Sequence, residues 1–255
     1  MEHLDLVTLA LLSVGVVGGI VNAVAGGATL ITFPVLMAVG LPPVTANASN
    51  AVAVSPGHLL AALADWRSIP PFDRHLWTLL TLSGLGGLAG AGLLLAVPAE
   101  AFVLPVPALI GLATALFAFA PRIAAASVRA GRGKAEGQAR EKAGLAAAAV
   151  YGGFFGAGLG IILTALLSLS EPDDIRKVKV LKNLLATIAA LFANAFFLIN
   201  GAVSWPVTWP MLLGALVGGY LGGYLIRILP AAIIRTVVIL AGSVMTVAYA
   251  YRFWL

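Results

Sequence analysis

The sequence predicts an all-α polytopic membrane protein made of two inverted repeats. Each repeat is expected to be a Gly-rich helical hairpin that does not cross the membrane, followed by three transmembrane helices. Composition, charge distribution and an internal repeat predict this architecture. Of the 255 residues, 61% are apolar and 10% are charged, whereas a soluble domain averages about 25% charged residues. The chain therefore lacks the polar side chains that a water-facing surface needs.

Charged residues are absent from three long stretches of the chain. No Asp, Glu, Lys or Arg lies within residues 6–64, 143–170 or 183–226. Because about 20 apolar residues cross a bilayer, we predict six full spans at 44–64, 76–97, 101–120, 183–200, 209–229 and 232–252. The first segment carries acidic residues where a signal peptide needs basic ones, so we expect no cleaved leader.

An internal repeat divides the chain into two membrane halves. Gly18-Gly19 matches Gly152-Gly153 at a shift of 134, Asn50 matches Asn183 at 133, and Pro98 matches Pro230 at 132. The predicted units are a first membrane repeat at 1–121, a basic cytoplasmic linker at 122–142 and a second repeat at 143–255. Repeats of this kind are common in secondary transporters.

Basic residues indicate how the two leading stretches, 4–41 and 143–169, sit in the membrane. If each crosses once, six basic residues of the second half lie outside. If each enters and leaves on the same side, 14 of the 15 basic residues lie inside and only Arg252 lies outside. Since cytoplasmic loops carry the excess of Lys and Arg, we predict hairpins that do not cross. Each half then has three crossings, which inverts the second half and leaves both termini in the periplasm.

Each predicted hairpin is interrupted by small and polar residues. The first contains Gly26, Gly27, Thr29 and Thr32, and the second contains Gly156 and Gly158 among other glycines. A helix broken inside a membrane is tolerated where its free backbone groups line a cavity. The alternative is close helix packing through small residues, and the glycines alone favour neither.

The helix after each hairpin opens with polar residues. The first begins with Asn47, Ser49 and Asn50, and the second has Lys182 and Asn183 near its start. Helix N-termini offer free N–H groups and partial positive charge, which suit anions. Lys177 and Lys179 fit better as anchors at lipid headgroups. The candidate substrate-binding residues are Asn22, Gly26, Gly27, Thr29, Thr32, Asn47, Ser49, Asn50, Gly156, Gly158, Lys182, Asn183, Thr187 and Asn194.

Several function classes are excluded by missing residues. The chain has no Cys, and its three His residues are scattered, so we expect no metal site, no cofactor and no catalytic residues. It has no phosphate-binding loop of the GxxxxGK[ST] form, so ATP is not its direct energy source. The net charge of +5 reports membrane orientation, and no nucleic-acid partner is expected. His58 lies in an apolar span, where a functional role and a neutral His bonded to a kinked backbone are both open.

Three segments carry a resemblance to a known family. They are GGIVNAVAGGATLITFPVLMAVGLPPVTANASNAVAVSPG (18–57), GGFFGAGLGIILTALL (152–167) and KVLKNLLATIAALFANAFFLINGAVSW (179–205). Their order of Gly-rich hairpin, AxxSN helix and repeated second half resembles the sulfite exporter TauE/SafE family of membrane permeases. The resemblance implies transport of small anions, typically sulfite or organosulfonates such as sulfoacetate, across the bacterial inner membrane.

The leading functional hypothesis is a secondary transporter for such an anion, working by alternating access. Its expected partners are the small anionic substrate, the lipid bilayer and a coupling ion, either a proton or sodium, with a homodimer as a further option. The alternatives are a permease of the same fold for another small anion or sulfur compound, and a membrane assembly subunit that transports nothing. An intramembrane enzyme is not expected, because the chain lacks a nucleophile with a base.

Overall fold

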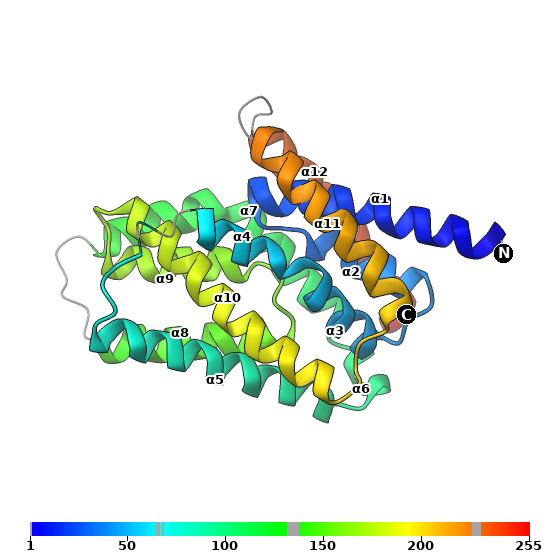
Figure 1. The fold of residues 1–255 in the computed structure, drawn as a ribbon, viewed down its shortest axis with the longest axis horizontal. Coiled ribbons are helices and arrows are strands. Elements are labelled where there is room, and N and C mark those ends of the chain that lie inside the picture. Colours follow the sequence, from blue (N-terminus) through cyan, green and yellow to red (C-terminus); the bar gives the residue numbers. More distant parts are fainter. Residues whose placement is uncertain (1, 65–66, 68, 132–137, 226–230) are drawn as a thin grey trace.

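The computed structural model describes residues 2–64, 67, 69–131, 138–225 and 231–255 (Figure 1). These residues form twelve α-helices and contain no strand. The prediction of an all-α fold is confirmed. Many of the helices lie side by side along one direction, as expected for a protein whose spans cross a bilayer.

The two halves contain helices in a similar order. The first half comprises α1 (Glu2–Ala25), α2 (Thr29–Ala38), α3 (Pro43–Val54), α4 (Pro56–Ala64), α5 (Arg74–Ala96), α6 (Ala99–Val103) and α7 (Val106–Gly131). The second half comprises α8 (Gln138–Phe154), α9 (Leu159–Ser170), α10 (Ile175–Ile199), α11 (Trp205–Leu225) and α12 (Ala231–Trp254). In both, a long helix is followed by a short one that doubles back.

Five stretches of the described chain are long and apolar enough to cross a membrane. They are Leu6–Ala23, Arg74–Ala96, Ala99–Ala130, Ile175–Ile199 and Ile233–Trp254. The polytopic membrane class is therefore confirmed. Three details differ from the predicted spans. The span predicted at 44–64 is broken into α3 and α4. The span predicted at 209–229 is not among the five, and its residues 226–229 lie outside the described residues. Helix α1 is long enough to cross by itself although it forms one leg of a hairpin.

Glycine ends the first leg of each hairpin. Gly26 and Gly156 both have φ +76°, and their N–H groups donate to the carbonyls of Val21 and Tyr151, five residues earlier, at 3.1 Å. A left-handed glycine closing a helix in this way is a common helix end. The two turns are 130 residues apart, so the predicted match of Gly18-Gly19 with Gly152-Gly153 is wrong. The former pair lies inside α1, whereas the latter lies in the last turn of α8.

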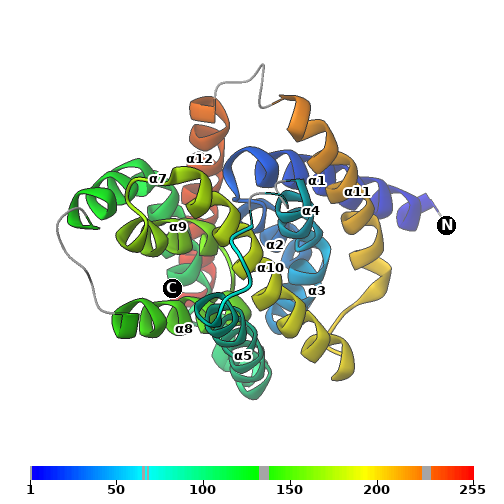
Figure 2. The same ribbon diagram turned by 60° about the vertical axis from the view of Figure 1, so that its left-hand side comes forward.

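The two halves exchange packing partners. Helix α1 packs along α11, and α8 packs along α5, as Figures 1 and 2 show. Glycines allow both contacts, since a Cβ at Gly214 would lie 2.1 Å from the Leu12 carbonyl oxygen and one at Gly90 would lie 2.0 Å from that of Val150. The packing interpretation of glycine thus holds for α5 and α11.

The hairpins open toward opposite ends of the molecule. The N- and C-termini lie toward one end of the long axis, and the ends of α7 and α8 that flank the linker lie at the other (Figure 1). The α1–α2 hairpin has its open end on the side of the termini, and the α8–α9 hairpin has its open end on the side of the linker. Their turns therefore point into the interior from opposite directions.

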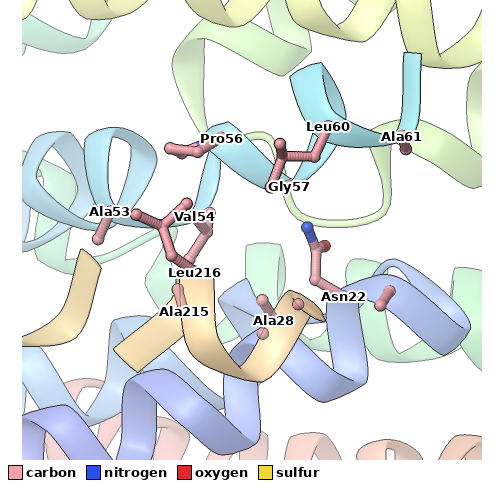
Figure 3. A pocket seen from close by; sticks show the side chains of 13 residues that line it. Asn22, Ala28, Ala53, Val54, Pro56, Gly57, Leu60, Ala61, Ala215 and Leu216 are labelled. Carbon is pink, nitrogen blue, oxygen red and sulfur yellow. The ribbon is translucent and has the colours of Figure 1, made fainter. Parts of the chain in front are cut away.

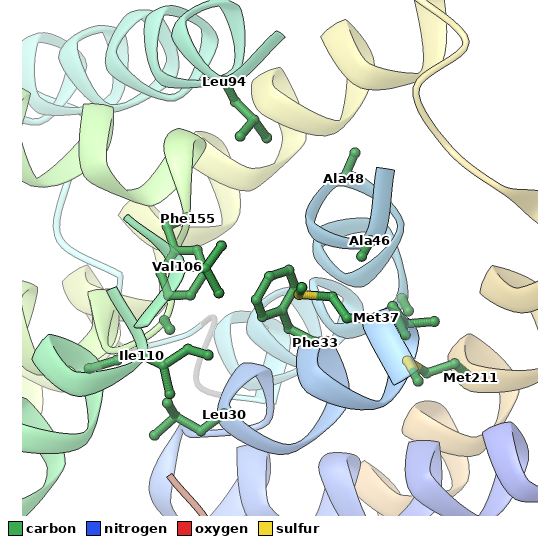
Figure 4. Packing of buried hydrophobic residues seen from close by; sticks show 14 of the residues in the cluster. Leu30, Phe33, Met37, Ala46, Ala48, Leu94, Val106, Ile110, Phe155 and Met211 are labelled. Atoms are coloured by element: carbon green, nitrogen blue, oxygen red, sulfur yellow. The ribbon is translucent and has the colours of Figure 1, made fainter. Parts of the chain in front are cut away.

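A buried aromatic contact joins the two hairpins. Phe33 of α2 is fully buried, and its ring meets that of Phe155, in the α8–α9 turn, edge to face at 5.4 Å. Figure 4 shows Phe33 among Met37, Val106 and Phe155. Edge-to-face pairs stabilise by about 0.5–1.5 kcal/mol beyond the burial of their area. This core fixes one hairpin against the other.

The glycine contact between α5 and α8 gives the first prediction. Gly90→Ala should lower the free energy of unfolding by roughly 1–3 kcal/mol, because its Cβ would lie 2.0 Å from a backbone oxygen. Gly92→Ala on the same helix is the control, since its Cβ would have no neighbour closer than 4.0 Å, and it should gain about 0.5–1 kcal/mol from helix propensity. Melting temperatures in detergent measure both, and equal shifts would contradict the packing assignment.

Candidate functional site

A polar cavity of about 340 Å³ lies between the two halves. We call it the lysine cavity. Its polar side chains come from four helices and are those of Asn22, His58, Thr164, Lys182 and Asn183. The cavity is lined in part by α1, α4, α9 and α10. We predicted a candidate residue or one leg of a hairpin on each of these four helices. A volume of this order is typical of small-molecule sites.

Lys182 is the cationic residue of the lysine cavity. It lies in the third turn of α10, and its stem passes 3.8 Å from where a Cβ at Gly160 of α9 would stand. Its ammonium makes no ion pair or hydrogen bond with a described residue. Lys177, one turn earlier, is instead paired with Glu171.

A smaller cavity of about 50 Å³ lies beside the first, and we call it the asparagine cavity. Its polar side chains are those of Thr29, Asn50, Ser55, His58 and Asn194. The turn of the second hairpin contributes the rest of one wall through Gly152, Gly153, Phe155 and Gly156. Predicted residues from both halves therefore meet here.

Asn50 is fixed on α3 by hydroxyl groups of α2. Its Oδ1 accepts a hydrogen bond from Thr32 at 2.5 Å, and its Nδ2 donates to Thr29 Oγ1 at 3.2 Å. Asn50 and Thr32 are 1% and 0% exposed. Since a buried amide must be bonded to be tolerated, the hydroxyls predicted as site residues hold Asn50 in place, and only Thr29 lines the cavity itself.

The break between α3 and α4 supplies residues that the sequence did not single out. Pro56 has no N–H, so the Val52 carbonyl loses its helical partner. Ser55 Oγ donates to that carbonyl at 3.4 Å, and Asn194 Nδ2 donates to Ser55 Oγ at 2.7 Å. The Ser-Pro-Gly sequence within an apolar span is the signal that could have identified this break.

His58 belongs to the walls of both cavities. It is the residue common to the lining of the lysine and asparagine cavities. Among the described residues, none forms a hydrogen bond with its imidazole. The alternative of a histidine bonded to the kinked backbone is therefore not what the structure contains. The broken helix places His58 between the two chambers.

An apolar cavity of about 240 Å³ adjoins the lysine cavity. It lies between α1, α3, α4 and α11, and its lining includes Ala53, Leu60 and Leu216. Figure 3 shows the Asn22 amide reaching from α1 toward Gly57. Asn22 and Gly57 line both cavities, so they mark the boundary between the apolar and the polar chamber.

Six predicted site residues line neither polar cavity, and one of them is Thr32, whose hydroxyl donates to Asn50. Gly27 faces Phe117, and Gly158 faces Leu116. Thr187 donates to the Asn183 carbonyl on its own helix, Asn47 donates to the Phe154 carbonyl, and Ser49 accepts from the Ser204 N–H. These residues satisfy backbone groups or allow close packing. Sequence reasoning identified the right helices, but it could not tell which face of each points inward.

Side chains for metal binding do not gather in the described ranges. No group of three His, Cys, Asp or Glu residues that could hold a metal ion occurs there. Neutral amides, hydroxyls and one ammonium dominate the two polar chambers. Such groups bind and orient a ligand, and they offer no nucleophile activated by a neighbouring base.

Residues 11–249 match the family model described as sulfite exporter TauE/SafE. The chain belongs to this family. A relative from Haemophilus influenzae, named "Probable membrane transporter protein", is 29% identical over an alignment of 258 positions that covers 97% of this chain and 96% of the relative. No solved structure matches the chain significantly. Membership of the TauE/SafE family makes the protein a membrane transporter rather than an enzyme.

The environment of Gly27 gives the second prediction. A Cβ at this position would lie 2.7 Å from Cζ of Phe117, so Gly27→Ala should destabilise the fold by roughly 1–3 kcal/mol. Phe117→Leu removes the opposing ring edge and should relieve part of this cost in the double variant. Chemical denaturation of the wild type and the three variants measures the coupling. Strictly additive effects would return Gly27 to the group of ligand-contacting residues.

Proposed function

We propose that the protein is a secondary transporter for a small anion, sulfite or an organosulfonate such as sulfoacetate, in the bacterial inner membrane. One observation carries the proposal: Lys182, which no described residue neutralises, lies in the polar cavity between the two halves. A charge kept in an apolar protein interior is costly without a partner. An anionic ligand supplies that partner.

The groups around Lys182 suit an oxyanion. Lys182 offers an ammonium, Asn183 offers an amide, and Gly160 belongs to the first turn of α9. The Thr164 hydroxyl donates its proton to the Gly160 carbonyl at 2.6 Å, so it is not among these donors. Hydrogen bonds that involve a charged group are about twice as strong as neutral ones, and the N-terminal turn of a helix favours negative charge. A sulfite or sulfonate group presents three oxygen acceptors to this set of donors.

We infer that alternating access uses the inverted-repeat relation between the halves. The opposite openings of the hairpins and the exchanged packing of α1 with α11 and α8 with α5 support this relation. The 14 basic residues counted on one side support a cytoplasmic linker and periplasmic termini. Since the chain has no phosphate-binding loop, an ion or substrate gradient drives transport.

A second candidate is a permease of the same fold for another small anion or sulfur compound. The apolar cavity that shares Asn22 with the lysine cavity favours a ligand with a carbon body over a fully polar one. The role of a membrane assembly subunit that transports nothing has less support. Such a role does not explain why a lysine without a charged partner among the described residues lies between the two halves.

The third prediction tests the lysine cavity. Lys182→Ala should weaken binding of sulfite or sulfoacetate by about tenfold or more, because a charge-assisted hydrogen bond contributes about 1.5–3 kcal/mol. Lys182→Arg should restore it only in part, since guanidinium has a different shape. Lys177→Ala is the matched control, because its ammonium is paired with Glu171. Calorimetry on the purified protein, at matched stability and salt, measures all three.

Ligand screening and flux complete this test. A thermal-shift series with sulfite, thiosulfate, sulfate, sulfoacetate, taurine and carboxylate analogues identifies ligands of the native state, since they raise its melting temperature. The protein should then transport the identified ligand across proteoliposome membranes, and Lys182→Ala should lower the rate of this transport. Equal binding by the wild type and Lys182→Ala would remove the anion site from this cavity.

The fourth prediction concerns topology. A periplasm-active reporter fused after Leu255 should be active, and one inserted between Gly131 and Gly137 should be silent, because 14 of 15 basic residues then face the cytoplasm. A reporter active only in the cytoplasm serves as the reciprocal control at both positions. Cytoplasmic activity after Leu255 would contradict the inverted arrangement.

A further inference from the structure

We propose that the asparagine cavity binds a monovalent cation of sodium's size, which is the ion coupled to anion transport. The binding site is argued from this cavity alone, whereas its coupling role rests on the proposed function. The cavity differs from the lysine cavity in size, in the polarity of its groups and in the helix ends that meet there.

Size separates the ligands of the two cavities. The asparagine cavity has a volume of about 50 Å³, against about 340 Å³ for the lysine cavity. A water molecule takes roughly 30 Å³ in the liquid. The smaller cavity therefore has room for a small ion together with one or two water molecules at most. An organosulfonate fits only in the larger one.

Asn194 presents an oxygen without a partner at this cavity. Its Nδ2 donates to Ser55 Oγ at 2.7 Å, while its Oδ1 is shielded from solvent and has no hydrogen-bond partner. A buried carbonyl oxygen without a hydrogen-bond partner destabilises the protein. A hard cation, which prefers oxygen ligands, removes this cost. Ser55 Oγ lies beside it and is a second neutral oxygen of the same wall.

Two residues at the end of α8 that line the same cavity have carbonyls without a donor among the described residues. Because Gly156 has φ +76°, its N–H donates to the Tyr151 carbonyl rather than to that of Gly152. In the described part of the chain, no donor bonds to the carbonyl of Gly152 or Gly153, and both residues line the cavity. The Gly152 oxygen lies 2.9 Å from where a Cβ at Gly156 would stand.

Two helix C-termini line the asparagine cavity. They are the ends of α3 and α8, which reach it through Val54, Ser55 and Gly153, and a helix C-terminus carries partial negative charge. Broken helices of transporters use their C-terminal carbonyls in this way to hold a coupling cation.

The donor set favours a monovalent ion. The lining of the asparagine cavity contains no Asp or Glu, whereas calcium sites in proteins rely on carboxylates. Neutral amide, hydroxyl and backbone oxygens suffice for an ion of single charge. His58, the titratable group in its wall, faces it from α4, and Lys182 faces the neighbouring chamber from α10.

Adjacency provides the coupling. The two cavities share His58, so a cation in one and an anion in the other lie in neighbouring chambers of low dielectric, where opposite charges attract strongly. Each ion therefore raises the affinity for the other, and by linkage the two effects are equal. Sodium should increase the apparent affinity for the anion, and the anion should increase the affinity for sodium.

The test measures binding of radioactive sodium to the purified protein, with choline chloride keeping the ionic strength constant. Asn194→Ala removes the free oxygen and should lower sodium affinity by about tenfold, as expected for one lost polar contact. Asn194→Asp keeps an oxygen and adds charge, so it should bind sodium at least as well as the wild type. Asn200→Ala is the matched control, because Asn200 is exposed at the end of α10 and its side-chain amide donates to the Phe196 carbonyl, away from both cavities.

The contrast between Ala and Asp separates a ligand from a structural residue. If Asn194 served only to donate a hydrogen bond to Ser55, both substitutions would be equally harmful, and the proposal would fail. If Asn194→Ala does not fold, Ser55→Ala is used in its place, and it should also weaken sodium binding. Wild-type protein that binds no sodium, or flux driven by a pH gradient without sodium and lost in His58→Gln, would overturn the proposal.

Failure of the two proposals can be told apart. If sulfite or sulfoacetate binds equally well in sodium and in choline, the lysine cavity stands and the coupling cation falls. If sodium binds with the expected response to the Asn194 substitutions but no anion binds in any salt, the cation site is supported and the proposed function is wrong.

Discussion

The need to satisfy backbone groups where helices break inside an apolar protein governs this structure. Gly26 and Gly156 turn their N–H groups back onto earlier carbonyls, Asn47 donates to the carbonyl of Phe154 at the end of α8, and Ser55 covers the carbonyl that Pro56 leaves free. Because no water reaches such groups in a bilayer, each break needs a backbone or side-chain partner nearby. Three of these residues also line the cavities: Gly26 lines the lysine cavity, and Ser55 and Gly156 line the asparagine cavity.

The two polar cavities differ in the groups that line them. The C-terminal ends of α3 and α8 line the small cavity, and the first turns of α4 and α9 line the large one together with the end of α1. A single ammonium, that of Lys182, lines the large cavity, while Asn194, whose oxygen has no partner among the described residues, lines the small one. A transporter built in this manner keeps few formal charges in its interior, which limits the cost of desolvation. It still offers distinct environments to ions of opposite sign.

Glycine has two separate uses in the chain. Along α5 and α11 it lets backbones approach closely, as at Gly90 and Gly214, while at Gly26 and Gly156 it provides a positive φ. Gly27 and Gly158, which looked like residues of the ligand site, contact Phe117 and Leu116 instead. Substitutions at glycine will therefore have different consequences according to position. Loss of folding is expected along the packed helices, and loss of ligand binding at the cavity walls.

The membrane class, the helical fold and the candidate helices can be predicted from the sequence alone, because runs of uncharged residues and turn-forming residues are local properties. The sequence also singled out Lys182, whose neighbour Asn183 lines the same cavity. The packing of the helices was needed to show that Asn50 and Lys182 belong to different chambers, that the span at 44–64 breaks at Ser55, and that His58 lies between the chambers. These facts depend on which face of each helix turns inward, and an apolar helix in lipid has no polar face that reveals it.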